Sequence, residues 1–356
     1  MKTFNRFNYC LFAILCIVVC LPLNAIELLV ELHYPTRTDE VLLTGMDGNS
    51  LVFRPKGRDD GGRAFLEIED LKRQKVTLNY LLSEQFYKGI ETLKDNRPIQ
   101  ALPLLEAEAG QLLEYNTLSQ LPGNYLLAVL PYMDALRYSR NWNRLVALIV
   151  EIPLADSPTE IVEKVGDIAF ALYAEKRVAA LDIVHKKITS IPQVAPEHVV
   201  SFSDIANSWR QAQEYQKAYE VYRLITASDR SLKHPSVLWA AYCGFYCLDK
   251  DSLEKIYCKL PEIDAGQAYF SFRRLLDTRW CLHQGDYPLA MRYAAEGKVY
   301  ANATEPWYPE LIHTLAVLYS NMNLVDEASL AHREVSAIFP NSRWAKKSLQ
   351  LLKDQK

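Results

Sequence analysis

The sequence predicts a mainly α protein, an α-α superhelix of about seven helical hairpins, preceded by a small antiparallel β module. Three observations support this prediction. One pattern of apolar and small residues recurs about every 34 to 38 residues toward the C-terminus. Five of the 13 glycines lie in residues 26–80, where short β-rich segments alternate with turns. Beyond residue 80, apolar residues recur at helical spacing between proline and glycine breakers.

The repeat is clearest in residues 199–226 and 308–339. Both stretches begin with two large residues, a small residue and an aromatic residue. A large, a small and a large residue follow in the second half. The members are Phe202, Ile205, Ala206, Trp209, Tyr215, Ala218, Tyr222 and Ile225, then Ile312, Leu315, Ala316, Tyr319, Val325, Ala328 and Val335. Parts of the pattern recur at Trp239, Tyr242, Cys243 and Tyr246, and at Cys281, Gly285, Asp286, Tyr287 and Ala290. This pattern resembles the tetratricopeptide repeat (TPR), a helical hairpin whose two small residues let its helices approach closely.

The resemblance implies a solenoid of stacked hairpins, each of which buries its apolar stripe against the next. We expect a signal peptide at 1–25, the β module at 26–80 and the TPR-like domain at 81–356. The expected hairpins cover 87–109, 125–151, 161–188, 199–226, 236–259, 269–297 and 308–339, with a capping helix at 343–352. The register is firm only from about residue 199. The earlier hairpins follow from breakers and amphipathic stretches. Among these is a helix start at Ser157-Pro158-Thr159-Glu160, with the serine expected as N-cap and the proline at the first helical position.

The β module is expected to contain strands at 26–32, 41–44, 51–54 and 64–68, with a hairpin turn within 45–50. A module of about 50 residues is too small to be very stable alone, so we expect it to pack on the helices. Its turn, its alternating strands and its place in the chain resemble the Sm-like or SH3-like module that precedes helical repeats in some secreted bacterial proteins.

The N-terminus has the features of a secretory signal. Lys2 and Arg6 precede an unbroken apolar run of 12 residues, Cys10 to Leu21, and Ala25 closes a plausible cleavage site. The run is short for a membrane-spanning helix. An uncleaved anchor and a lipoprotein modified at Cys20 are the alternatives. We therefore expect an exported protein, periplasmic, envelope-associated or secreted, with no stable membrane span after cleavage.

Four cysteines lie outside the expected signal: Cys243, Cys247, Cys258 and Cys281. Cys243 occupies the small-residue position of its repeat. We therefore favour a buried thiol that acts as a small hydrophobic residue over a disulfide with Cys258.

Composition and motifs argue against several classes of function. The formal net charge of −3 gives no electrostatic footprint for nucleic acid. The chain lacks the Gly-x-Ser-x-Gly, His-Glu-x-x-His and Walker motifs, and its seven histidines are scattered. Zinc bound by the cysteines with His234 or His283 lacks the usual Cys-x-x-Cys spacing. We expect no catalytic residue, no metal site and no cofactor.

In TPR proteins the first helices of successive hairpins line a concave groove that binds peptides or protein segments. The resemblance places groove residues at fixed offsets from the small residue of each first helix. Those offsets give the candidates Ser203, Asn207, Arg210, Gln211, His313 and Asn321, with Val317 and Ser320 between the last two. Their polar groups could bond a peptide backbone or a carboxylate, and the alternative is an ordinary solvated helix face. The lysines and asparagines of the family's two-carboxylate clamp are not matched here.

The sequence thus predicts a non-enzymatic scaffold or adaptor that binds a protein or peptide partner, of unknown identity, in the groove of its repeats. An envelope-polymer (glycan or peptidoglycan) binding subunit or enzyme is the alternative, because Trp307 and Tyr308 could stack on sugars. An RNA-binding repeat is opposed by the net acidity and by export.

Overall fold

The computed structural model describes residues 28–56, 62–228 and 235–354, so the expected signal peptide at 1–25 lies outside the described residues. The chain divides into two compact units, residues 1–187 and residues 188–356, which are treated separately below. Within the described residues, no helix is both long enough and apolar enough to cross a membrane.

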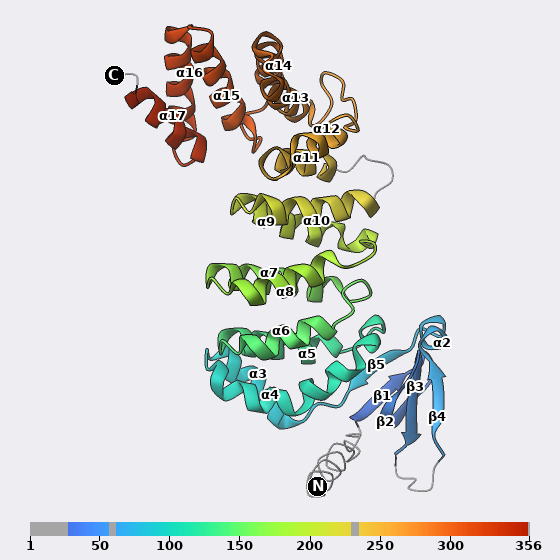
Figure 1. Ribbon diagram of the computed structural model, residues 1–356. Helices are drawn as coiled ribbons and strands as arrows, with labels where there is room; N and C mark the ends of the chain where they lie inside the picture. The colour runs from blue at the N-terminus through green and yellow to red at the C-terminus, as the bar shows by residue number, and fades with distance from the viewer. Residues whose placement is uncertain (1–27, 57–61, 229–234, 355–356) are drawn as a thin grey trace, which may run out of the picture. The chain divides into compact units, whose positions relative to one another are not determined.

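The first unit begins with a five-stranded antiparallel sheet of strand order β4-β3-β2-β1-β5 (Figure 1). Its strands are β1 (Leu28–His33), β2 (Thr38–Asp47), β3 (Ser50–Pro55), β4 (Ala64–Glu67) and β5 (Thr77–Tyr80). Alternate residues of neighbouring strands are buried, among them Val30 and Leu32 in β1 and Val41 and Leu43 in β2. This period of two is the pattern of a sheet with one face in the core.

Two features of the sheet differ from the sequence-based expectation. Strand β2 continues to Asp47, because a register shift between Leu43 and Gly45 keeps β2 paired with β3 beyond that point. The turn between these two strands is therefore only Gly48 and Asn49. Gly48 takes the left-handed φ of 59° that this tight turn needs. Strand β4 ends before Ile68, which instead opens the short helix α2 (Ile68–Arg73).

The sheet is attached to the helices of the first unit through its edge strand β5. The Leu78 N–H donates to the Pro122 carbonyl at 2.8 Å, and the Asn124 side chain pairs with both backbone groups of Tyr80 at 2.7 and 2.8 Å. Gly123 lies so close that a Cβ atom there would be 1.8 Å from the Leu78 carbonyl oxygen. The β module therefore packs on the helical part of its unit, as expected from its size.

Helical hairpins follow, and their bounds agree closely with the expected ones. In the first unit they are α3 (Glu84–Lys94) with α4 (Pro98–Leu112), α5 (Tyr125–Tyr138) with α6 (Trp142–Glu151), and α7 (Thr159–Ala174) with α8 (Val178–Thr189). In the second they are α9 (Val199–Gln211) with α10 (Tyr215–Ser228), α11 (Ser236–Cys247) with α12 (Lys250–Tyr257), α13 (Phe270–Gln284) with α14 (Tyr287–Tyr300), and α15 (Tyr308–Asn321) with α16 (Val325–Ile338). The helix α17 (Arg343–Asp354) packs on α16 and α15. The fold is a TPR-like array of helices.

The predicted serine cap of α7 is wrong. The helix begins at Thr159 after Pro158, and no side chain caps it. The Ser157 hydroxyl donates instead to the Pro153 carbonyl at 3.0 Å.

The backbone repeats as regularly as the side chains. In most hairpins of the described chain, a single residue in the turn between the two helices takes the left-handed conformation. These residues are Asn96, Arg140, Lys176, Gln213, Gly285 and Asn323. The N–H of each such residue and that of the next residue bond back to the last turn of the helix, as in Lys176 to Tyr173 and Arg177 to Leu172. This Schellman-type ending satisfies the free carbonyls and reverses the chain.

The small residues of the repeat lie where the helices meet. Ala206, Ala218, Ala316 and Ala328 are all fully buried. Cys243, in the equivalent position of α11, is also fully buried, which confirms its role as a small core residue.

Candidate functional site

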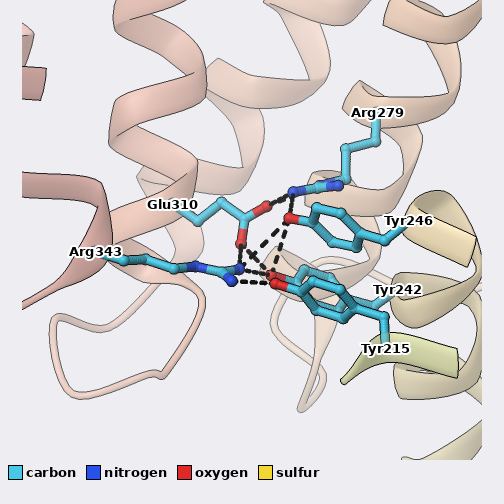
Figure 2. Close-up of polar contacts among 6 residues, drawn as sticks. All are labelled: Tyr215, Tyr242, Tyr246, Arg279, Glu310 and Arg343. Carbon is cyan, nitrogen blue, oxygen red and sulfur yellow. Dashed lines mark hydrogen bonds and ion pairs between the residues drawn. The ribbon is translucent and has the colours of Figure 1, made fainter. Parts of the chain in front are cut away.

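Five polar side chains of the second unit gather around one buried carboxylate (Figure 2). The carboxylate is that of Glu310, in the first turn of α15, and its side chain is 2% exposed. The other members are Arg279 of α13, Arg343 of α17, and three tyrosines: Tyr215, the first residue of α10, with Tyr242 and Tyr246 of α11. We call these six residues the Glu310 cluster.

Glu310 is bonded through both of its oxygens. Arg279 donates from Nε to Oε1 at 2.8 Å, and its Nη2 also donates to this oxygen. The Tyr242 hydroxyl donates to Oε2 at 2.6 Å, and Nη2 of Arg343 lies 3.8 Å from the same atom. The two guanidinium groups approach the carboxylate from different sides (Figure 2). A carboxylate so deeply buried needs this pairing, because an unpaired charge there would cost several kcal/mol.

Arg343 connects α17 to two helices far earlier in the chain. Its Nη2 donates to the Tyr242 hydroxyl at 2.6 Å, and its Nη1 donates to the Tyr215 hydroxyl. The rings of Tyr215 and Tyr246 are stacked, with centroids 3.9 Å apart. The stack fixes the position of both hydroxyls, and Tyr246 in turn accepts a hydrogen bond from Arg279.

Burial and the Glu310 charge together set the protonation of the cluster. Burial, followed by the neighbouring Glu310 carboxylate, raises the pKa of both Tyr242 and Tyr246, so both phenols stay neutral. Burial, the largest single influence, lowers the pKa of Arg279, but Glu310, Tyr246 and Tyr242 together raise it by more, so the pKa lies above its ordinary value. The pKa of Arg343 is raised as well, so both guanidinium groups of the cluster are cationic at neutral pH.

A cavity of about 310 Å³ lies beside the cluster, between the ends of α9, α11, α15 and α17. Arg210, Trp239, Trp307 and Arg343 belong to its lining; the remaining lining residues are Gln211, Gln213, Tyr242, Pro306, Pro309, Glu310, Ser342 and Trp344. The guanidinium carbon of Arg210 lies 3.8 Å from the centroid of the Trp239 ring, a cation–π contact. We call this space the Arg210 cavity.

A second cavity, of about 450 Å³, lies along α11, α13, α15 and α17 and shares Trp344 with the first. Its polar lining consists of Tyr246, Arg279, His283, His313, Thr314 and Lys347. We call it the His313 cavity. The Nδ1 atom of His313 lies 2.8 Å from the Ser348 hydroxyl, and burial lowers the pKa of this histidine to about 4.

The structure brings some of the sequence-derived candidates together. Arg210 and Gln211 line the first cavity, and Asn207 lies behind Arg210, accepting from its Nη2 at 3.2 Å and from Tyr222 at 2.7 Å. His313 lines the second cavity. Ser203 bonds within its own helix, to the Val199 carbonyl at 2.7 Å, and the exposed Asn321 lines neither cavity.

The Glu310 cluster itself was not identified from the sequence. In α13 the buried Thr278 takes the repeat position that Ala206 has in α9. The candidate Asn207 is the residue after Ala206, and the corresponding residue after Thr278 is Arg279. The same register applied to α13 would have found it. Arg343 lies beyond the last repeat, where no offset is defined, and Glu310 stands in a first turn, where an acidic residue is common for helix-dipole reasons alone.

Other candidate chemistry gains no support from the geometry. Within the described residues, no group of three or more histidine, cysteine or acidic side chains could hold a metal ion. The four described cysteines are free thiols. Trp307 is 6% exposed and its ring stacks on Phe272 at 4.7 Å, which leaves little of its face for a sugar.

Comparisons with known proteins identify no family. No protein-family model matches the sequence, and no curated protein matches it significantly. Among solved structures the chain is similar to the apo form of the quorum sensor NprR from B. thuringiensis, with 12% identity over 80% of each chain and a TM-score of 0.37. It is also similar to a protein from Podosopora anserina with nearly identical kinesin-light-chain TPR-like repeats, at 14% identity, over 71% of this chain and 92% of that one, with a TM-score of 0.23. Both scores are low, so the TPR-like fold follows from this chain's own helices and turns.

Proposed function

We propose that the protein is a non-enzymatic interaction protein whose second unit binds an extended segment of a partner protein. The segment would lie along the first helices of the hairpins, across the Arg210 cavity and the His313 cavity. The observation that carries this proposal is the pair of adjoining cavities, which share Trp344 and are lined with fixed hydrogen-bond donors. Two cavities in series suit the side chains of an extended chain better than a single compact ligand.

The alternative of a glycan-binding subunit is less well supported by the same geometry. Sugar binding needs an open aromatic face, whereas Trp239, Trp307 and Trp344 are each less than a tenth exposed. Trp239 is covered further by Arg210 on its ring.

Export is part of the proposal. The motivating features are Lys2, Arg6 and the apolar run from Cys10 to Leu21. The protein would then meet its partner in the periplasm, at the envelope or outside the cell. N-terminal sequencing of the mature protein tests this: a chain that begins at Ile26 supports export, and one that begins at Met1 in the cytoplasm contradicts it.

Site-specific photo-crosslinking in the native host tests partner binding. A photoreactive residue would replace Gln211 in the first cavity or Thr314 in the second, with Val299 on α14, which is 79% exposed, as the control position. We expect the same protein to be captured from both cavity positions and not from Val299. Capture of nothing from either cavity, or of the same set of proteins from all three positions, would contradict the proposal.

A further inference from the structure

The Arg210 cavity has two arginines that are held in place before any ligand arrives. Arg210 lies on Trp239 and donates from Nε to Tyr222 at 3.2 Å and from Nη2 to Asn207 at 3.2 Å. Arg343 lies 4.5 Å from the centroid of the Trp344 ring and donates to Tyr215 and Tyr242. Guanidinium groups fixed in this way lose little side-chain entropy when they bind a ligand.

Each of these arginines has one nitrogen that is free to donate to a ligand. Among the described residues, Nη1 of Arg210 and Nε of Arg343 make no hydrogen bond. Both side chains line the same cavity. A ligand with two acceptor oxygens could therefore bond to both without breaking a contact of the protein.

The charge around the cavity is unbalanced. Arg210 and Arg343 line it with a single acid, Glu310, whose oxygens are already taken by Arg279 and Tyr242. Lys347 and Arg279 add further positive charge in the adjoining His313 cavity, which has no acidic residue in its lining. This excess of cations stands in a chain whose formal net charge is −3, so it is a local feature that favours an anionic group.

We propose that the Arg210 cavity binds one carboxylate side chain, that of an aspartate or glutamate, in the partner segment. The carboxylate would accept from Arg210 and Arg343, and the edges of Trp239 and Trp307 would contact its methylene groups. A volume of about 310 Å³ is enough for one side chain with its flanking backbone and too small for a folded element. This assignment rests on the proposed function and adds the chemistry of the residue recognised.

Small probes test the assignment on the full chain without a known partner. Glutarate carries the carboxylate, glutaramide is its uncharged match, and inorganic phosphate is the competing oxyanion. The readout is the NMR signal of the arginine Nε–H groups. Exposed Arg333 of α16, which lines neither cavity, is the control. We expect glutarate to shift Arg210 and Arg343 with millimolar affinity, and glutaramide to leave all three signals unchanged.

Two variants make the test specific. Arg210→Gln should weaken glutarate binding about tenfold or more, because a charge-assisted hydrogen bond is lost. Gln211→Glu should weaken it about as much, because it adds a negative charge at an exposed lining position with no loss of folded contacts. The second variant keeps the test valid if the first folds poorly.

The results separate this assignment from the proposed function. Shifts in Arg333 as large as those in Arg210, or equal binding of glutarate and glutaramide, would overturn the carboxylate site. Phosphate that binds more than about tenfold tighter than glutarate would overturn it in favour of a phosphoryl group. Crosslinking from Gln211 would still succeed in those cases if the segment binds by other contacts, whereas failure of crosslinking alone would contradict the proposed function.

Discussion

The guanidinium group of Arg343, in the first turn of the last helix, donates to the hydroxyl of Tyr242 on α11 at 2.6 Å across 101 residues of sequence. The same side chain reaches Tyr215 on α10. Local stacking of neighbouring hairpins does not require such a contact. Arg343 ties the C-terminal helix to two earlier hairpins of its unit, and with Tyr242 it lines the Arg210 cavity.

Removing this tie should loosen the second unit. Arg343→Met keeps the apolar stem and removes the hydrogen bonds to Tyr215 and Tyr242, so we expect a loss of about 1.5–3 kcal/mol in the free energy of unfolding. Urea denaturation measures it. Arg333→Met on α16 is the matched control, because Arg333 is exposed, and it should change stability by less than about 0.5 kcal/mol.

The buried ion pair should behave as a coupled unit. Glu310→Leu leaves Arg279 buried without its anion and should destabilise the protein by about 3–5 kcal/mol. Adding Arg279→Met should recover a large part of that loss, because the remaining charge is removed. A double-mutant cycle in urea measures the coupling. Additive effects of the two changes would show that the pair does not act as the geometry indicates.

Gly123 should not tolerate a side chain. In Gly123→Ala the new Cβ would lie 1.8 Å from the Leu78 carbonyl oxygen, so the loop and strand β5 must separate. We expect a loss of about 3 kcal/mol or more, measured by thermal or urea unfolding. Gly110→Ala in α4 is the control: its Cβ would meet no atom within 4 Å, and it should be neutral or stabilising.

The left-handed turns offer a stabilising change. Lys176 has a φ of 58°, which a residue with a Cβ adopts at a cost. Lys176→Gly should therefore raise the free energy of unfolding by about 0.5–1 kcal/mol. Ala174→Gly, within α7 two residues earlier, should lower it by about 1 kcal/mol. Equal effects at both positions would contradict the turn geometry.

Acid should destabilise the contact of α17 with α15 and α16. The Nδ1 atoms of His313 and His332 lie 2.8 and 3.0 Å from the Ser348 hydroxyl, and burial lowers both pKa values, that of His313 to about 4. The unfolded chain takes up these protons near pH 6.5, before the folded one does. Stability is therefore full above pH 6.5 and falls as the pH drops toward 4, by about 3 kcal/mol for His313.

Comparison with a variant isolates this effect from other titrating groups. His313→Asn removes one of the two histidines and keeps a polar group beside Ser348. The difference in unfolding free energy between the two proteins should change between pH 6.5 and pH 4 and be constant above pH 7. A difference that is independent of pH over this window would show that His313 is not held neutral.

The helices could be predicted because their signal is local. The repeat is recognised by short-range features: alanine at the close helix contact, an aromatic residue one turn later and breakers between hairpins. Ala206, Ala218 and the turn at Gly285 lie where this repeat predicts them. The short helix α2 and strand β5 were missed because each has only a few residues. The state of β5 depends on contacts with Pro122 and Asn124, and α2 begins at Ile68, whose N–H donates to the Asn49 carbonyl; no local pattern reports these contacts.

The candidate site could be predicted only in part for a similar reason. Offsets within one repeat find Arg210 and Gln211, which line a cavity, and His313, which lines the other. They cannot show that Arg343, after the last repeat, returns to Tyr215 and Tyr242. That relationship depends on how successive hairpins rotate, which is set by packing along the whole unit.

Hydrogen exchange of the full chain, with and without the partner segment captured by crosslinking, tests the central claim most directly. If the segment binds along the two cavities, added protection should fall on α9, α11, α13, α15 and the start of α17. The sheet and the second helices α12, α14 and α16 should exchange as before. Protection that falls mainly on those second helices or on the sheet would contradict the account.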